Sequence, residues 1–339
     1  MAQWNQIFPG NMRNRRFRVC LGNSDTAARV ADAFFPKSDS SRGKVVVEAY
    51  PGPGVLTRAL LQLPPGRIRK LIVLEDIPEY YEKVKELEAH DPRVVALNLD
   101  ALSWDTYTEI EQRGLLDDLE KRNWEDASDV EFVCHMPHSL HGEQFTAQLL
   151  RSIPQKSWLF TYGRMPMHLI LAESLYDRVL GSSRRTRCKL SIIAEATTSF
   201  QYSIQPGDLK PYIQHFWPPP ITRSSDLPES RKAGHPMVAS TFMPLPEQHI
   251  GSDALDEWDY CLRRLYVLKN TTLDKAVSSL APGAHNLLAS INKNLPAEQH
   301  INVKAKVNEL SVKDWATLVK AFKEWPFAPD VRMISNRLS

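Results

Sequence analysis

Short apolar runs alternate with longer mixed segments through the first 135 residues. Four runs of three or four apolar residues end close to Gly, Pro, Asp or His, at residues 45–47, 71–74, 94–97 and 132–134. Such runs are typical of strands buried on both faces of a parallel sheet. The segments between them, such as 56–63 and 78–89, are long enough for helices. The alternation predicts an α/β fold with helices on both faces of the sheet and ligands at the carboxyl ends of the strands.

The pattern changes in the second half of the chain. Residues 190–194 are expected to form one more strand, and a Pro-rich segment, 216–220, leads into a polar stretch, 221–235, that resembles a surface loop. Beyond residue 246 the apolar positions follow a helical period. One predicted helix face carries Trp258, Leu262, Leu265 and Tyr266. A domain boundary is therefore expected near residue 246.

The last predicted helix has both a start and a stop signal. Ser311 and Asp314 have the spacing of a capping box, and Pro326 and Pro329 end the helix. Its apolar stripe consists of Trp315, Leu318, Val319 and Phe322. The remaining residues have little to pack, so they are expected to be loosely held. The predicted organisation is a larger domain over residues 1–245, a helical domain over 246–330 and a flexible basic tail over 331–339.

Composition and charge narrow the class of protein. The 339 residues carry a net charge of +2, so bulk attraction to nucleic acid is not expected, and no apolar run is long enough to span a membrane. The four cysteines form no C-x-x-C pair, which argues against a zinc ribbon or a disulfide framework. Residues 105–131 hold 10 acids and three bases, a surface suited to a basic protein partner. Residues 1–24 contain arginines and no acid, which favours import into mitochondria.

A glycine-containing loop follows the first predicted strand. Gly52 and Gly54 form a Gly-x-Gly turn before a helix, where the missing Cβ atoms let a ligand approach the backbone closely. Glu75 ends the next strand, where an acid can accept both ribose hydroxyls. Asp100 follows the third strand, where it could accept from an adenine amino group. Each acid alone is more often a helix cap or a solvated loop residue, but together they favour an adenosyl ligand.

The glycine loop also carries a family resemblance. Residues 48–57 resemble the Glu-x-x-Pro-Gly-x-Gly-x-Leu-Thr loop of the ribosomal RNA adenine dimethyltransferases and their descendants, the mitochondrial transcription factors B, and residues from Tyr162-Gly163 to Leu190-Ser191 are similar to a later core segment. The resemblance spans most of residues 15–330. It implies a class I, Rossmann-like S-adenosylmethionine-dependent methyltransferase fold with a small C-terminal all-α domain. It also implies seven cofactor-binding residues: Leu21, Glu48, Gly52, Gly54, Glu75, Asp100 and His135.

Other segments resemble the fungal transcription-factor branch of this family. These segments are residues 104–107, 257–260, 268–269 and 324–327 with 329–330. The tryptophans at 258, 315 and 325 are themselves expected to be core or interface anchors rather than stacking platforms for bases. The glycine loop is specific to the wider family, whereas the tryptophan-bearing segments indicate the branch.

Two departures from the family bear on catalysis. His135-Met136-Pro137-His138 stands where the dimethyltransferases have Asn-Leu-Pro-Tyr, whose amide holds the target amine and whose ring stacks on the flipped base. A histidine cannot reproduce the combined donor and acceptor geometry of the amide. Residues 16–19, Arg-Phe-Arg-Val, replace the family's Gln-Asn-Phe-Leu. We therefore expect no catalytic residues and methyl transfer that is absent or very weak. The spacing of His135, His138 and His141 around Pro137 also argues against a metal site.

The resemblance implies a mitochondrial transcription initiation factor in the matrix. It would bind the mitochondrial RNA polymerase, help to recognise and melt promoter DNA, and hold the displaced single strand, with S-adenosylmethionine as a cofactor that is retained or vestigial. The alternative is an active mitochondrial ribosomal RNA adenine-N6,N6-dimethyltransferase, favoured by the glycine loop, Glu75 and Asp100. A third hypothesis is a cofactor-binding remnant that contacts ribosomal RNA in ribosome assembly.

Basic residues mark two candidate surfaces for nucleic acid. Arg184, Arg185, Arg187 and Lys189 lie together ahead of an apolar run, and a solvated loop is the alternative for such a cluster. Arg332 and Arg337 lie in the tail, which contains no acid after Asp330. The tail is expected to be mobile in the free protein and to contact melted template DNA in the initiation complex.

Overall fold

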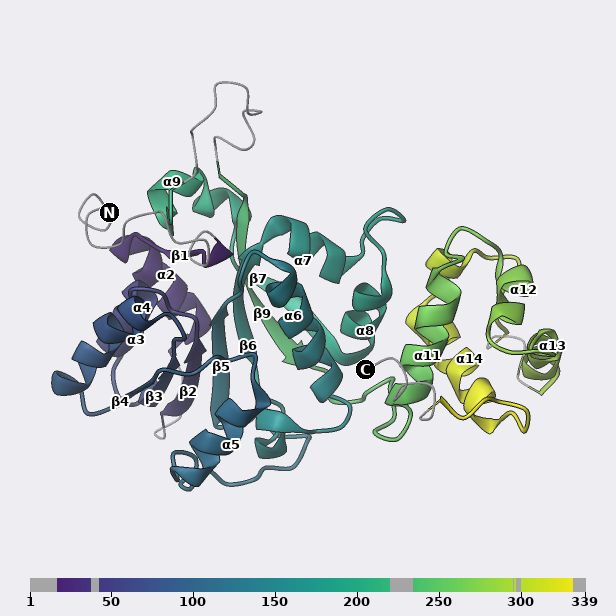
Figure 1. Ribbon diagram of the computed structural model, residues 1–339, viewed down its shortest axis with the longest axis horizontal. Coiled ribbons are helices and arrows are strands. Elements are labelled where there is room, and N and C mark those ends of the chain that lie inside the picture. Colours follow the sequence, from purple (N-terminus) through teal and green to yellow (C-terminus); the bar gives the residue numbers. More distant parts are fainter. Residues whose placement is uncertain (1–16, 38–42, 220–233, 295, 297–299, 332–339) are drawn as a thin grey trace. The chain divides into compact units, whose positions relative to one another are not determined.

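The computed structural model describes residues 17–37, 43–219, 234–294, 296 and 300–331. The described chain divides into two compact units (Figure 1). The first comprises Met1–Leu149, Trp158–Tyr176 and Ser199–Pro246, and the second comprises Leu150–Ser157, Asp177–Thr198 and Glu247–Ser339. The predicted nucleic-acid residues of the tail, Arg332 and Arg337, lie outside the described residues.

A seven-stranded sheet forms the centre of the first unit. Its order is β4-β3-β2-β5-β6-β9-β7, and the first five of these strands are mutually parallel whereas β9 runs antiparallel to β6. The strands are β2 (Lys44–Ala49), β3 (Ile68–Leu74), β4 (Val94–Leu97), β5 (Val130–His135), β6 (Met167–Ala172), β7 (Thr198–Ile204) and β9 (Met237–Pro244). The four predicted parallel strands are thereby confirmed. Their buried Val, Ile and Leu side chains explain why each run is continuously apolar.

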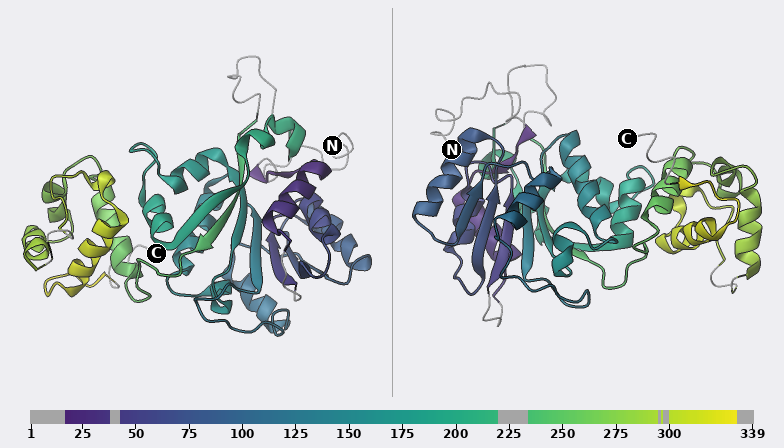
Figure 2. Two further views of the ribbon diagram at one scale, coloured as in Figure 1. Left: turned by 180° about the vertical axis from the view of Figure 1, so that it is seen from behind. Right: turned by 60° about the horizontal axis from the view of Figure 1, so that its bottom comes forward.

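Helices cover both faces of this sheet. One face packs against α2 (Ser24–Phe34), α3 (Val55–Gln62) and α4 (Pro78–Lys85), seen together beside the strands in Figure 2. On the other face, Phe132 of β5 contacts Phe145 of α6 (Leu140–Ser152) and Trp158, which in turn contacts Tyr107 of α5 (Trp104–Gln112). A small antiparallel pair joins β1 (Cys20–Leu21) to β8 (Phe216–Trp217). The predicted class I methyltransferase architecture is therefore present.

One predicted strand is wrong. Residues 190–194 belong to the helix α8 (Lys189–Thr197), which follows α7 (Glu173–Leu180). The hydroxyl of Ser191 accepts from the backbone N–H of Cys188 at 2.7 Å, which closes a capping box at the start of this helix. Most of its side chains are buried, including Ile192, Ile193 and Ala194. A short apolar run cannot distinguish a buried strand from a helix that is buried on most sides.

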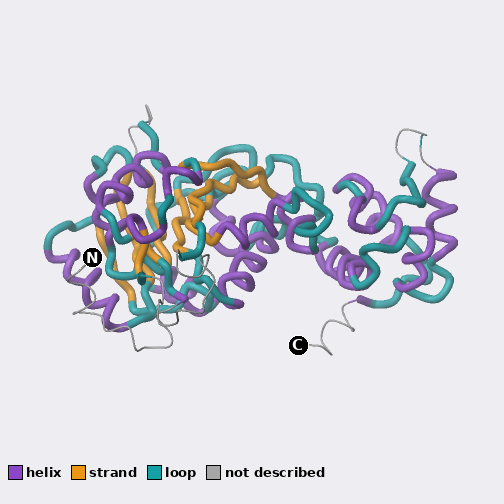
Figure 3. Tube along the Cα trace, turned by 90° about the horizontal axis from the view of Figure 1, so that it is seen from above, coloured by secondary structure: helices purple, strands orange, loops and turns teal. Residues whose placement is uncertain are grey.

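The second unit is built from helices and loops, which are purple and teal in Figure 3. Besides α8 it contains α11 (Leu255–Tyr266), α12 (Leu273–Ala276), α13 (His285–Asn294) and α14 (Val312–Glu324). Trp258 and Trp315 are buried, and Trp315 stacks on Tyr266 with ring centroids 5.8 Å apart. The predicted helical period and apolar stripes are confirmed, because Leu262, Leu265, Leu318, Val319 and Phe322 are all buried.

The start of α14 also matches the sequence pattern. The hydroxyl of Ser311 accepts from the backbone N–H of Asp314 at 3.2 Å, and the Asp314 carboxylate accepts from the backbone N–H of Ser311 at 2.8 Å. Within the described part of the chain, no helix is long and apolar enough to cross a membrane. The domain limits at residues 245 and 330 remain a prediction.

Candidate cofactor site

The predicted cofactor residues of the first unit gather where its parallel strands end. The glycine loop follows β2, Glu75 and Asp76 follow β3, Asp100 follows β4, and His135 is the last residue of β5. Since these strands are parallel neighbours, their carboxyl ends lie at one edge of the sheet. A backbone hydrogen bond from Glu75 to the Leu97 carbonyl at 3.1 Å holds the ends of β3 and β4 together.

The glycine loop requires glycine at both predicted positions. Gly52 has φ of 64° and Gly54 has φ of 81°, in the left-handed region that side chains disfavour. A Cβ atom at Gly52 would lie 2.6 Å from Cys20 Sγ, and one at Gly54 would lie 2.7 Å from Val84 Cγ1. The space that these glycines leave is therefore filled by side chains of the protein.

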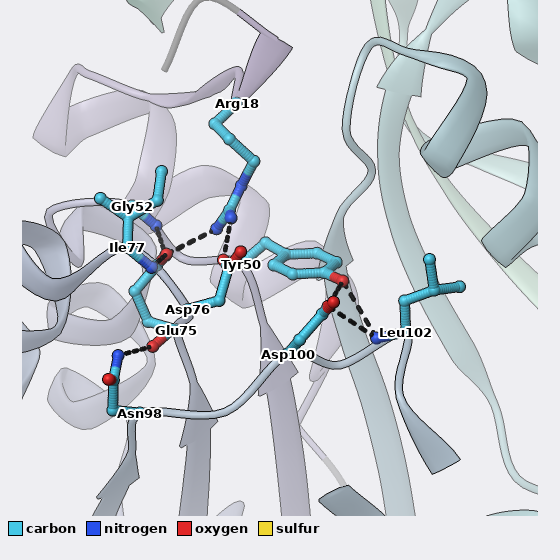
Figure 4. A network of polar contacts seen from close by, with 9 residues as sticks. All are labelled: Arg18, Tyr50, Gly52, Glu75, Asp76, Ile77, Asn98, Asp100 and Leu102. Carbon is cyan, nitrogen blue, oxygen red and sulfur yellow. Dashed lines mark hydrogen bonds and ion pairs between the residues drawn. The ribbon is translucent and has the colours of Figure 1, made fainter. Parts of the chain in front are cut away.

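Glu75 is the most heavily bonded residue of this edge (Figure 4). Arg18 Nη2 donates to both of its carboxylate oxygens, at 2.7 and 2.8 Å. The backbone N–H groups of Gly52 and Ile77 donate to the same carboxylate at 2.9 and 3.0 Å. Arg18 also pairs with Asp76 through its other terminal nitrogen. Glu75 is fully buried and Arg18 is 8% exposed, so water does not screen this pair.

The charges of this cluster depend on one another. Burial raises the pKa of Glu75, and the Arg18 guanidinium and the N–H groups of Ile77 and Gly52 oppose that rise because they stabilise the carboxylate. Burial lowers the pKa of Arg18, but Glu75 and Asp76 together outweigh this effect and raise it. Arg18 therefore remains a cation beside two acids.

Tyr50 lies in the glycine loop, at the same edge of the sheet as Glu75. Its backbone has φ of 57°, although it is not a glycine, and its ring lies 4.2 Å from the Arg18 guanidinium carbon. The Tyr50 hydroxyl donates to Asp100, and the backbone N–H of Leu102 donates to both of these side chains at 3.0 Å. Burial and then the contact with Asp100 raise the pKa of Tyr50, so the phenol stays neutral.

These contacts decide whether an adenosyl group fits the site. A ribose would need the oxygens of Glu75, which already accept four hydrogen bonds from the protein. An adenine amino group would need Asp100, which is paired with Tyr50. The fold is that of an S-adenosylmethionine-binding protein, but as the side chains are arranged Glu75 is not free to accept from a ribose, whereas Asp100 still lines the neighbouring pocket. The assignment of the seven residues to cofactor binding remains a prediction.

His135, the last residue of β5, has contacts that differ from those expected of the asparagine amide of the dimethyltransferases. His135 is buried, and its Nε2 accepts from the backbone N–H of Leu21 at 3.3 Å. Its Nδ1 has no hydrogen-bond partner among the described residues. Burial and the charge of Arg18 lower the pKa of His135 to about 3, so the imidazole is neutral. His138 meets His235 edge-on at a centroid distance of 4.1 Å.

In the part of the chain that the structure describes, no group of three or more His, Cys, Asp or Glu side chains is placed to hold a metal ion. Glu48, the remaining predicted cofactor residue, is fully buried, and burial raises its pKa to about 8. Its carboxyl group is therefore largely protonated at neutral pH.

A pocket of about 920 Å³ lies beside the Arg18 and Tyr50 side chains. Its lining includes both of these residues together with Asp76 and Asp100, and also the exposed Phe17 and Leu140. Of the seven predicted cofactor residues, Asp100 alone lines this pocket. The pocket therefore stops at Arg18 and Tyr50, short of Glu75.

The predicted basic cluster lies in the second unit, and its members differ in their surroundings. Arg187 Nη2 donates to the Leu310 carbonyl at 3.0 Å, and Nη1 pairs with Glu195 at 2.9 Å. Arg184 pairs with Glu309 but its side chain is 70% exposed. Arg185 and Lys189 are exposed. Arg184, Arg185 and Lys189 are therefore accessible to a ligand, whereas Arg187 is bonded to other residues of the second unit.

Sequence reasoning missed Arg18 and Tyr50. The signal for Arg18 was its place in a segment that departs from the family, and the signal for Tyr50 was a bulky residue inside the glycine loop. Neither signal identified the acid that each side chain contacts. Those partners lie 57 and 50 residues away in the sequence.

Comparison with known proteins places the chain among curated relatives of two kinds. It is 26% identical over 299 residues to Mitochondrial transcription factor 1 of Saccharomyces paradoxus, covering 85% of this chain and 82% of the relative. It is 24% identical over 298 residues to the Saccharomyces cerevisiae protein of the same name, with the same two coverages. It is 21% identical over 343 residues to the mitochondrial Dimethyladenosine transferase 1 of Vermamoeba vermiformis, covering 88% of each chain.

The fold has a solved counterpart as well. The crystal structure of the 23S rRNA methyltransferase ErmE superposes with a TM-score of 0.51 at 14% identity, covering 90% of this chain and all of that one. This likeness supports the methyltransferase fold. The family model described as Ribosomal RNA adenine dimethylase matches residues 21–324. Since the match covers nearly the whole described chain, both units included, the protein belongs to the ribosomal RNA adenine dimethylase family.

Proposed function

We propose that this chain is a mitochondrial transcription initiation factor that binds the mitochondrial RNA polymerase and assists it in recognising and melting promoters. Its similarity to fungal proteins named Mitochondrial transcription factor 1, over 85% of its length, carries this proposal. The pairing of Glu75 with Arg18 and of Asp100 with Tyr50 agrees with it, because a factor that does no methyl transfer has no need of a free nucleoside site. The relatives support a mitochondrial location, and we propose the matrix as the compartment in which the protein works.

The proposal predicts that initiation depends on this protein and that the dependence is greater on duplex DNA. Run-off transcription by the cognate mitochondrial RNA polymerase is expected to need the factor on a linear duplex promoter. On a promoter pre-melted around the start site, the requirement should be several-fold weaker, because the factor no longer has to help open the DNA. An equal requirement on both templates would contradict a role in melting, and transcription of duplex promoters without the factor would contradict the proposal as a whole.

The second candidate function, ribosomal RNA dimethylation, is favoured by the similarity to Dimethyladenosine transferase 1. We expect the purified protein to transfer no measurable methyl group from tritiated S-adenosylmethionine to small-subunit ribosomal RNA. The physical reason is that neutral His135 accepts from Leu21 and cannot supply the amide geometry that grips an adenine amine. A ribosomal RNA dimethyltransferase active on the same RNA serves as the positive control. Robust formation of dimethyladenosine would establish the enzyme instead.

The exposed basic cluster is proposed to contact single-stranded promoter DNA weakly, with little sequence preference. Each phosphate neutralised contributes about 0.7 to the log–log salt slope of single-strand binding. Replacing Arg185 and Lys189 together by alanine should therefore reduce the slope by about 1.4 in a fluorescence-anisotropy titration. Arg187→Ala is the matched control, because Arg187 is bonded to Leu310 and Glu195. An unchanged slope in the double variant would identify the cluster as a solvated loop.

A further inference from the structure

We propose that Arg18 and Tyr50 form an internal plug that fills the nucleoside half of the cofactor site, and that removing the plug opens the site to S-adenosyl ligands. The proposal rests on membership of the dimethylase family and not on the role in transcription. It concerns two side chains that no comparison assigns. Three features carry it: the bonding of Glu75, the backbone of Tyr50 and the position of the neighbouring pocket.

Arg18 takes the place of hydrogen-bond donors that a ribose would bring. Both carboxylate oxygens of Glu75 face the guanidinium at 2.7–2.8 Å, and the two backbone N–H groups supply the remaining bonds. Glu75 is fully buried, so its charge needs a partner in the folded protein. A diol could serve as that partner, but a fixed cation serves without any ligand. With Arg18 in place, a nucleoside would have to displace a buried ion pair in order to bind.

Tyr50 is the second residue of the plug. Its left-handed backbone is the conformation that favours glycine, so it is held against local strain by the surrounding contacts. Those contacts are the Arg18 guanidinium over the ring, the edge of Phe145 at a centroid distance of 6.0 Å, and Asp100 with Leu102 at the hydroxyl. Glycine at this position would adopt the same backbone without strain and would remove the whole ring.

The plug separates the neighbouring pocket from the Glu75 carboxylate. The pocket is lined by Arg18, Tyr50, Asp76 and Asp100, and its volume of about 920 Å³ is sufficient for a ligand of cofactor size. Glu75, which Arg18 contacts directly, does not line it. Truncating both side chains would connect the pocket to the Glu75 carboxylate and free Asp100 from the Tyr50 hydroxyl, leaving it the N–H of Leu102. The acids predicted to accept from a ribose and from an adenine amine would then face one continuous space.

Isothermal titration calorimetry with S-adenosylhomocysteine tests the proposal on the full chain. The variants are Arg18→Ala, Tyr50→Gly and the double variant, and adenosine alone probes the nucleoside half. We expect no saturable binding to the unsubstituted protein at about 1 mM ligand, and a dissociation constant at least tenfold lower for the double variant. Arg93→Ala is the control, because Arg93 is a partly buried arginine bonded to Asp91 and to the Leu63 and Ile68 carbonyls, outside the pocket.

Thermal unfolding with and without S-adenosylhomocysteine separates binding from folding. A ligand that binds only the folded state raises its melting temperature, so Arg18→Ala should gain a ligand-dependent rise that neither the unsubstituted protein nor Arg93→Ala shows. If the Arg18→Ala variant does not fold, the same ligand-dependent rise is measured on Tyr50→Gly, because glycine suits that backbone conformation. Tight binding by the unsubstituted protein, or no binding by folded plug variants, would overturn the proposal. Loss of initiation activity in the same variants would concern the proposed function and not the plug.

Discussion

Replacing Arg18 by alanine is expected to lower the free energy of unfolding by about 3–5 kcal/mol, measured by urea denaturation at neutral pH. The substitution leaves the carboxylate of Glu75 buried beside Asp76 with no cation. Removing one partner of a buried pair costs more than the pair itself contributes, because the remaining carboxyl group has lost its water and must either stay charged alone or take up a proton. The ring of Tyr50 also loses the guanidinium that lies over it.

A double-mutant cycle provides the control for this prediction. Glu75→Gln combined with Arg18→Met removes both charges and keeps most of the buried volume, so the double variant should be clearly more stable than Arg18→Ala. The amide of glutamine can still accept from the backbone N–H groups of Gly52 and Ile77. If the effects of Arg18→Met and Glu75→Gln on the free energy of unfolding were additive, Arg18 and Glu75 would not act as a pair.

Replacing Glu48 by glutamine is expected to stabilise the protein increasingly as the pH rises from about 5 to above 8. Burial raises the pKa of Glu48 from its ordinary value of 4.5 to about 8 in the folded state. The folded protein therefore keeps a proton that the unfolded chain releases, and stability falls as the pH rises through this window. The slope approaches about 1.4 kcal/mol per pH unit. Above pH 8 the gain from glutamine should reach several kcal/mol, on the order of the full linkage effect.

The dependence of the free energy of unfolding on pH below about 6.5 serves as an internal control. Burial and Arg18 lower the pKa of His135 to about 3, so His135 contributes stability that is present above its ordinary pKa of 6.5 and is lost as the pH falls toward 3. The free energy of unfolding that depends on His135 falls as the pH decreases, whereas the part that depends on Glu48 falls as the pH increases. The loss from His135 should be the same in Glu48→Gln and in the unsubstituted protein. Urea titrations at pH 5.0, 7.0 and 8.5 would measure both limbs. Parallel profiles for the two proteins above pH 5 would show that Glu48 is ionised in the folded state.

Four parallel strands and the place of the site could be read from local sequence, whereas β6, β7 and β9 were not predicted. Apolar runs of fixed length separated by helical segments leave few topologies, and parallel strands bring their carboxyl ends to one edge. Glu75 and Asp100 could therefore be placed at the same edge before any contact was known. The helix α14 was equally predictable, because the Ser311 capping box and the apolar stripe are both local signals. The segment 190–194 was not, since a buried helix and a buried strand share the same apolar run.

What each acid contacts was decided by tertiary structure alone. The sequence determined a family, an α/β fold with a helical second part, and a set of acids at strand ends, because these depend on periodicity and on spacing along the chain. It did not determine that Arg18 would reach Glu75, that Tyr50 would reach Asp100, or that Arg187 would turn inward to Leu310. These pairs join residues from 50 to 123 positions apart. The free energy of each pair depends on burial and on direction, which exist only once the chain has folded.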